Sequence, residues 1–237
     1  MKKFILSMVV ILPFYAFADG HNSAGPGEGS FTTVMVQAPN VSAYIKHIKN
    51  NPMLFKGFNA AAAGVCVTIT GQEYLGEMFI WSAHSNVQGA MEETTAYNFD
   101  DASEDIAKFR TLKYKVAWKP LKPFVLSPGF ERVTRVKIKP ENVPAYIAAA
   151  TKLEAAIRKA GHDFNMGIFQ PLGGGTHETG TFLLRGVSPN SSEAGRLIDE
   201  YFAGAEWGQQ YLEASSLIDK VVRDTYESCQ LFYSAEQ

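Results

Sequence analysis

An internal repeat constrains the fold of this 237-residue chain more than any other feature of its sequence. Residues 34–45 align with residues 136–147 at an offset of 102, with six identical residues in twelve. Further matches occur at offsets that rise one residue at a time to 105, as loop insertions between two copies would produce. The sequence therefore predicts two units in tandem, over 31–127 and 130–234.

Each unit has the pattern of strand, helix, strand, strand, helix and strand. Apolar and polar residues alternate over 33–37, which indicates a strand. Asn40 and Asn142 are placed to cap the helix that follows in each unit. We expect the last strands near 123–127 and 227–233. A βαββαβ unit of about 100 residues is typical of the ferredoxin-like fold, an α+β architecture with both helices on one face of an antiparallel sheet.

The N-terminal segment has the features of an export signal. Residues 1–18 begin with Lys2 and Lys3, continue as an apolar run and end in small residues at Ala16 and Ala18. The run is shorter than the roughly 20 residues that a membrane-spanning helix needs. The Gly-rich stretch 19–30 is expected to be a flexible leader. We therefore expect a secreted or periplasmic protein that has no membrane contact after signal cleavage.

The charge balance and the histidine spacing exclude two classes of partner. With 22 basic and 24 acidic side chains, the chain lacks the basic excess of a nucleic-acid-binding protein. Its five histidines do not pair with carboxylates at the spacings typical of metal ligands. We therefore expect neither a nucleic-acid partner nor a metal site.

Two such units in one chain resemble the dimeric α/β-barrel superfamily, which includes the antibiotic-biosynthesis-monooxygenase, EthD and NIPSNAP-type proteins. The resemblance covers most of the chain at the level of pattern. It implies that the two sheets pack face to face and form one pseudo-symmetric α/β barrel. It also implies two kinds of oxidation chemistry, one without a cofactor and one with a haem bound by a single histidine. We expect no cofactor here, and haem stays open as an alternative.

The alternation along the strands predicts which side chains face the interior of this barrel. Val34, Val36 and Val136 fit the helix-covered face, so their neighbours in sequence point the other way. Arg and Lys there would suit an anionic organic molecule. The alternative is a set of basic residues on a partly hydrated sheet face, offset by nearby acids. The predicted ligand-binding residues are Met35, Gln37, Trp81, Arg135, Lys137 and Arg185.

His84 is the one candidate for a catalytic side chain. It ends a predicted strand just before Asn86, which would place it at the mouth of the barrel as an acid, a base or a ligand. If haem were present, His84 and Trp81 would be the residues to inspect. The alternative is a loop histidine without a chemical role.

The two cysteines lie on predicted strands of opposite units. Cys66 is on the second strand of the first unit and Cys229 is on the last strand of the second. An exported protein meets oxidising conditions, and edge strands from the two halves approach each other when a barrel closes. A disulfide and two separate buried thiols are both compatible with this placement.

Three functions follow from these observations. The first is an exported protein that binds a small, anionic organic ligand between its two sheets. The second is a monooxygenase-like enzyme, either independent of a cofactor or assisted by haem. The third is a non-catalytic structural protein that acts by homo-oligomeric assembly. A large cavity lined by Trp81 and Arg185 would favour one of the first two, whereas a filled barrel interior would favour the third.

Overall fold

The computed structural model describes residues 29–98 and 103–235. The expected signal peptide over 1–18 and nearly all of the expected leader over 19–30 lie outside these residues. Ser30, the last residue of that leader, already belongs to the first strand. No helix in the described part of the chain is both long enough and apolar enough to cross a membrane.

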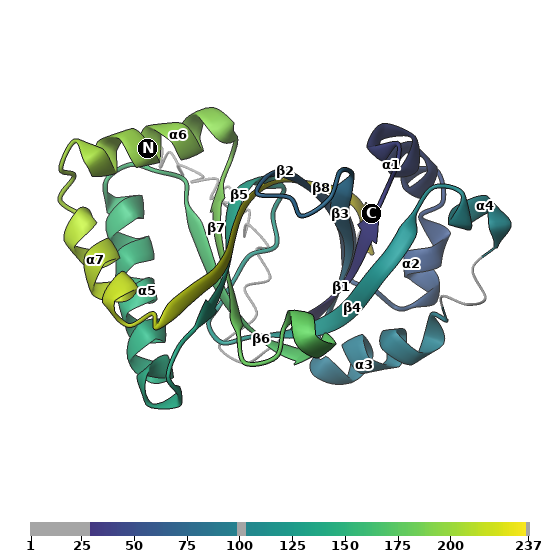
Figure 1. Cartoon of the computed structure of the whole chain (residues 1–237), viewed down its shortest axis with the longest axis horizontal. Helices are drawn as coiled ribbons and strands as arrows, with labels where there is room; N and C mark the ends of the chain where they lie inside the picture. The colour runs from purple at the N-terminus through teal and green to yellow at the C-terminus, as the bar shows by residue number, and fades with distance from the viewer. Residues whose placement is uncertain (1–28, 99–102, 236–237) are drawn as a thin grey trace, which may run out of the picture.

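A closed antiparallel barrel forms the centre of the molecule (Figure 1). Around the closed barrel the strands follow the order β4-β1-β3-β2-β8-β5-β7-β6. The first four strands in this order belong to the first predicted unit and the last four to the second. Equivalent strands of the two units therefore occupy equivalent places in the barrel. An α+β fold with a strand barrel is thereby confirmed. The strands are β1 (Ser30–Gln37), β2 (Ala62–Thr70), β3 (Glu77–His84), β4 (Thr111–Pro120), β5 (Gly129–Lys137), β6 (Asn165–Gly173), β7 (Phe182–Ser188) and β8 (Lys220–Ser234).

Helices cover the outside of the barrel in two groups on opposite sides (Figure 1). The first group is α1 (Val41–Lys49), α2 (Met53–Gly57), α3 (Val87–Ala96) and α4 (Glu104–Ala107). The second group is α5 (Val143–Lys159), α6 (Ser191–Phe202) and α7 (Gly208–Ser216). Short 3-10 turns at Pro140–Asn142 and Gly175–His177 complete the second half. Each group therefore packs on the outer face of its own half of the sheet.

The predicted helix caps are correct in one half only. The Asn40 side chain accepts a hydrogen bond from the backbone N–H of Ala43 at 3.0 Å and so caps α1. Asn142 makes no such bond, because the 3-10 turn at Pro140–Asn142 leads directly into α5 and places Asn142 in a helical conformation. A cap needs an extended backbone at that position.

The last strand of the first half lies earlier in the chain than predicted. It is β4 at Thr111–Pro120, whereas 123–127 is a loop. Val116 and Trp118 alternate on β4 and fill the barrel interior. Pro123 has no N–H to donate to a sheet, which disfavours a strand at that point. The last strand of the second half, β8, includes 227–233 but begins at Lys220.

Side chains fill the interior of the barrel. The apolar part of this interior contains Phe31, Met35, Cys66, Phe79, Trp81, Ala83, Val116, Trp118, Val133, Phe169, Leu183 and Cys229. A disulfide joins Cys66 to Cys229, which face each other across β2 and β8. The bond links the two halves where their sheets meet.

Three ion pairs accompany the apolar core. Arg185 lies 2.6 and 2.7 Å from the two carboxylate oxygens of Glu131. Arg135 binds Glu178, and Arg223 binds Glu77. Because all three carboxylates are almost fully buried, removal of either partner would leave an uncompensated charge in the core.

Glu227 is a fourth buried carboxyl group, and no arginine of the described chain is bound to it. Thr225 donates a hydrogen bond to one of its oxygens at 3.1 Å, and the other oxygen has no partner among the described residues. Glu131 faces it across β5 and β8. Burial, and then the charge of Glu131, raise the pKa of Glu227 to about 7. The folded protein therefore holds a proton on Glu227 in mildly acidic solution.

We predict that Glu227 makes the protein less stable as the pH rises from 4.5 to 7. Over this range the unfolded chain releases the Glu227 proton while the folded chain retains it, which lowers the free energy of unfolding by about 3 kcal/mol. Urea denaturation of the wild type and Glu227→Gln at several pH values measures the effect. As the pH rises, the free energy of unfolding of the wild type should fall relative to that of Glu227→Gln. Glu141→Gln is the control, because Glu141 is exposed, and it should show the same pH dependence as the wild type. Parallel curves for Glu227→Gln and wild type would contradict the prediction.

The disulfide gives a second prediction. The bond closes a loop over a sequence separation of 163 residues, so its loss should lower the free energy of unfolding by about 2–5 kcal/mol. The double variant Cys66→Ala/Cys229→Ala, compared with wild type in urea, measures this loss. Reductant should destabilise the wild type and leave the double variant unchanged. Equal sensitivity of both to reductant, or an unchanged mass on reduction of unfolded wild type, would rule the bond out.

Candidate functional site

The structure brings together four of the six residues that the sequence assigned to a ligand site. Met35 and Trp81 lie in the apolar core of the barrel, and Arg135 and Arg185 lie in the ion pairs described above. The other two are elsewhere. Gln37 donates a hydrogen bond to the Leu75 carbonyl oxygen at the exposed end of β1, and Lys137 is exposed at the end of β5, opposite Lys220.

The expectation of a binding protein that holds an anionic ligand between its two sheets is therefore wrong. The Arg185 guanidinium is already neutralised by Glu131, and Arg135 Nε lies 2.9 Å from both carboxylate oxygens of Glu178. Packed side chains occupy the space that the ligand would need. The sequence showed the arginines on the interior face but not their partners, which are 54 and 43 residues away.

His84 does not lie at an open mouth of the barrel. It is buried between β3 and α3, where its Nε2 is 2.5 Å from Glu93 Oε2. Thr32 donates a hydrogen bond to the same oxygen at 2.9 Å. This cluster ties α3 to β1 and β3. A catalytic role for His84 stays a prediction from the sequence.

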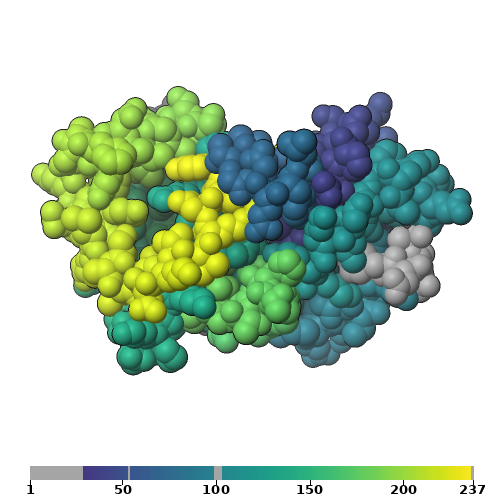
Figure 2. All heavy atoms as spheres, in the orientation of Figure 1, coloured from purple at the N-terminus to yellow at the C-terminus, as the bar shows by residue number. Residues whose placement is uncertain are grey.

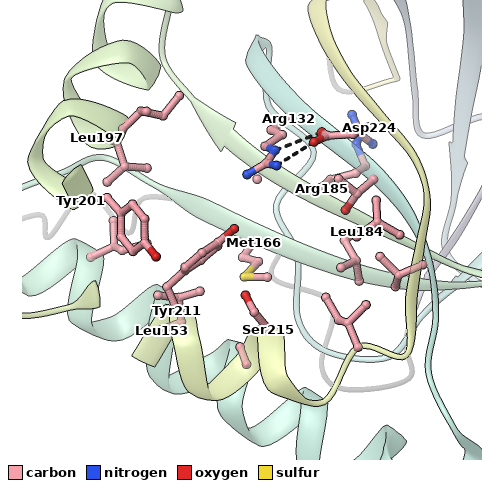
Figure 3. A pocket seen from close by; sticks show the side chains of 18 of the residues that line it. Arg132, Leu153, Met166, Leu184, Arg185, Leu197, Tyr201, Tyr211, Ser215 and Asp224 are labelled. Carbon is pink, nitrogen blue, oxygen red and sulfur yellow. Dashed lines mark hydrogen bonds and ion pairs between the residues drawn. The ribbon is translucent and has the colours of Figure 1, made fainter. Parts of the chain in front are cut away.

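A large cavity lies outside the barrel, between the sheet of the second half and helices α5, α6 and α7 (Figure 3). Its volume is about 650 Å³. The molecular surface is hollowed between the light-green helices α6 and α7 and the yellow strand β8 (Figure 2). We call this space the helix–sheet pocket. Its apolar walls include Leu153, Ile157, Met166, Leu184, Leu197 and Ile198.

A few polar groups face this apolar space. Tyr201 and Tyr211 stand side by side, with ring centroids 4.9 Å apart, and their hydroxyl groups point toward the same space as that of Ser215 (Figure 3). Arg132 and Asp224 form a two-bond ion pair at the exposed rim, at 3.0 and 2.6 Å. Hydrogen bonding to Asp224 raises the pKa of Arg132, so the guanidinium stays charged. The pocket thus combines apolar walls with hydroxyl groups and one ion pair.

In the first half, the equivalent space between the helices and the sheet is a cavity of only about 70 Å³. Arg110 lines that space, with its guanidinium 5.9 Å from the ring centre of Tyr44. At the repeat offset, Ser82 corresponds to Gly186, where an added Cβ would lie only 3.1 Å from the ring of Phe164. The pairs of residues that line both cavities include Val34 and Val136, Tyr44 and Tyr146, Ile80 and Leu184, and Tyr97 and Tyr201.

Sequence reasoning missed the helix–sheet pocket because its lining has the pattern of an ordinary core. Helix-facing apolar residues alternate on the strands whether they pack tightly or enclose a cavity. The available signal was the greater length of the helical segments in the second repeat, where α5 has 17 residues and α1 has nine.

The donor atoms of the pocket do not fit a haem held by histidine or thiolate. No histidine is among the described residues that line it. His162 is bonded to Glu200 at 2.7 Å, and both cysteines form the disulfide. Cys66, Cys229 and Glu131 lie close enough to hold a metal ion, but the sulfurs are bonded to each other and Glu131 binds Arg185. We therefore derive no step through haem or a metal.

The sequence matches no established protein family and no curated protein sequence. Solved structures with the same fold do exist. An anthrone oxidase-like protein superposes with a TM-score of 0.61 and 8% identity, covering 91% of this chain and 96% of its own. A "putative monooxygenase" from Lactobacillus acidophilus superposes with a TM-score of 0.58 and 13% sequence identity, covering 86% of this chain and 95% of its own. A mutant chlorite dismutase from Candidatus Nitrospira defluvii superposes with a TM-score of 0.51 and 10% sequence identity, covering 87% of this chain and 92% of its own.

These identities establish the fold alone. The α/β-barrel fold that the resemblance implied is shared with these structures over most of the chain.

Proposed function

We propose that this protein is an oxidising enzyme of the monooxygenase type, which takes an apolar organic substrate into the helix–sheet pocket and uses no haem. The observation that carries the proposal is the cavity of about 650 Å³, which falls within the range of roughly 300–1,000 Å³ for small-molecule sites. The similar structures described as a monooxygenase and as anthrone oxidase-like support an enzyme over a carrier. A shared fold by itself does not determine the reaction, which depends on the residues that line the pocket.

The walls of the pocket suit oxidation without a cofactor. In such a reaction the substrate itself supplies electrons to oxygen after it has lost a proton. Apolar walls such as Leu153 and Leu184 exclude water from the resulting anion and admit oxygen, an apolar gas. At the rim, the Asp224 carboxylate can accept the proton once its two hydrogen bonds to Arg132 open, which also frees the guanidinium to stabilise negative charge.

The proposal includes a specialisation of the two halves. We infer two ferredoxin-like units, over 31–127 and 130–234, of which the second keeps the site. The shared strand order of the halves supports this inference. So does the contrast between a filled cavity beside Tyr44 and an open one beside Tyr146. Among the families that the sequence resembles, the antibiotic-biosynthesis-monooxygenase group fits this proposal best.

We also propose that the protein works in an oxidising compartment outside the cytoplasm. The Cys66–Cys229 disulfide supports this location, because such bonds persist mainly in exported proteins. Assembly into a homo-oligomer stays a prediction from the sequence.

Turnover of anthrone tests the proposed activity. The substrate is chosen for its apolar rings and its acidic ring hydrogen. Purified wild-type protein, with no added cofactor or metal and with a chelator present, should consume oxygen and convert anthrone to a more oxidised product. An oxygen electrode and absorption spectra follow the reaction against a protein-free control. No oxygen uptake above that control by protein that binds anthrone would contradict the proposed chemistry.

A bulky residue in the helix–sheet pocket should block binding. We predict that Ser215→Phe, which places a ring in the cavity, weakens binding of the neutral fluorophore N-phenyl-1-naphthylamine by about tenfold or more. Ser216→Phe is the matched control, because Ser216 is the next residue of α7 and is exposed. It should bind like the wild type, as measured by fluorescence titration. Equal affinity in Ser215→Phe and wild type would show that the fluorophore binds elsewhere.

A further inference from the structure

Two sulfur atoms and one carboxylate meet in the barrel interior, and none of them lines the helix–sheet pocket. The sulfurs of Cys66 and Cys229 and an oxygen of Glu131 all lie within 4.8 Å of one another. We call these three residues the seam cluster. They lie on the adjacent strands β2, β8 and β5, and all three are buried. Strand pairing therefore holds the cluster together whether or not the two sulfurs are bonded to each other.

The oxidation state of the sulfurs decides what this cluster can bind. In the disulfide neither sulfur has the negative charge of a thiolate, which is the form of cysteine that binds metals. A dithiol that reduces the bond supplies two electrons and two protons and is itself oxidised to a disulfide. The cluster then holds two thiols, which release their protons when a metal ion binds. Two thiolates and a carboxylate, with water at a fourth position, form a donor set that suits zinc.

Arg185 lies beside the cluster, and its charge is compatible with a bound zinc ion. Its Nη2 atom is 3.9 Å from both sulfurs and 2.7 Å from one oxygen of Glu131. A carboxylate has about four lone-pair sites, so Glu131 can keep its bonds to Arg185 and still offer an oxygen to the ion. The charges of two thiolates and Glu131 balance those of Zn²⁺ and Arg185. The zinc-bound cluster is therefore neutral as a whole, as a buried group of charges needs to be.

We propose that reduction of the disulfide converts the seam cluster into a zinc site, with Cys66, Cys229 and Glu131 as ligands and Arg185 as the residue that orients Glu131. Such an outer partner of a ligand is common at zinc sites. Cys66 belongs to the first half, whereas Cys229 and Glu131 belong to the second. The ion therefore joins the two halves at the seam that the disulfide joins in the oxidised protein. It does so in a chain whose disulfide has not yet formed, or has been reduced by a dithiol.

Titration of zinc into the reduced and the oxidised wild type tests the proposal. Oxidised wild type is the matched control, because it has the same histidines and surface carboxylates. By calorimetry in several buffers, the reduced protein should bind a single zinc ion and release about two protons. Its affinity should be about a hundredfold or more above that of the oxidised form. Cobalt(II), used as a probe, should give a thiolate charge-transfer band with the reduced form only. Equal affinity of the two forms for zinc, or no binding to either, would overturn the proposal.

Variants then identify the ligands. Cys66→Ala/Cys229→Ala should lose the site, and Glu131→Gln should bind zinc about tenfold or more weakly, whereas the exposed control Glu141→Gln should bind it like the wild type. Wild-type affinity in Glu131→Gln would remove Glu131 from the site.

Urea denaturation is a second readout that needs no change at Glu131. Zinc should raise the free energy of unfolding of the reduced wild type, or refold it where reduction alone unfolds it. The oxidised wild type and Cys66→Ala/Cys229→Ala should gain nothing from zinc. An equal gain in this double variant, or no gain in the reduced wild type, would overturn the proposal.

Discussion

Closure of the barrel is the constraint on which the rest of the structure depends. Pairing of β2 with β8 and of β4 with β6 joins the two halves, so no strand of the barrel is left with a free edge. Closure also turns one face of every strand into an interior that water does not fill. Any charge on that face must then be paired, and each of the three interior arginines binds a carboxylate from another segment of the chain. The disulfide reinforces the same seam.

The barrel interior is packed with side chains, and the helix–sheet pocket lies on the outer face of the sheet. That face is enclosed in both halves, because helices pack on each side of the barrel (Figure 1). The halves differ in how completely their helices and strands fill the space between them. In the first half Arg110 and Glu93 line a space of only about 70 Å³, whereas the second half encloses a cavity of about 650 Å³. The two halves share a strand order but differ in their helices, since α5 has 17 residues where α1 has nine, and α7 adds Tyr211 and Ser215 to the wall of the larger cavity.

The sequence predicted the features that depend on local pattern. Alternation along β1 placed Val36 toward the helices and Met35 in the interior, as the structure has them. Alternation cannot identify partners that are distant in sequence, so it leaves open whether Arg185 binds a ligand or a nearby acid, and in the structure Glu131 neutralises it. Nor can it distinguish a wall that encloses a cavity from one that packs tightly, which is why the helix–sheet pocket was missed. The misplaced last strand had a local cause, since the alternation of Val116 and Trp118 on β4 was overlooked.

The central claim is that the helix–sheet pocket of the second half, and not the barrel interior, holds the substrate. A crystal structure of the protein soaked with 2-naphthol tests this most directly. The account predicts electron density for the ring system between α5, α7 and the sheet of the second half. Density beside Tyr44 or between the two sheets, with the helix–sheet pocket empty, would contradict it.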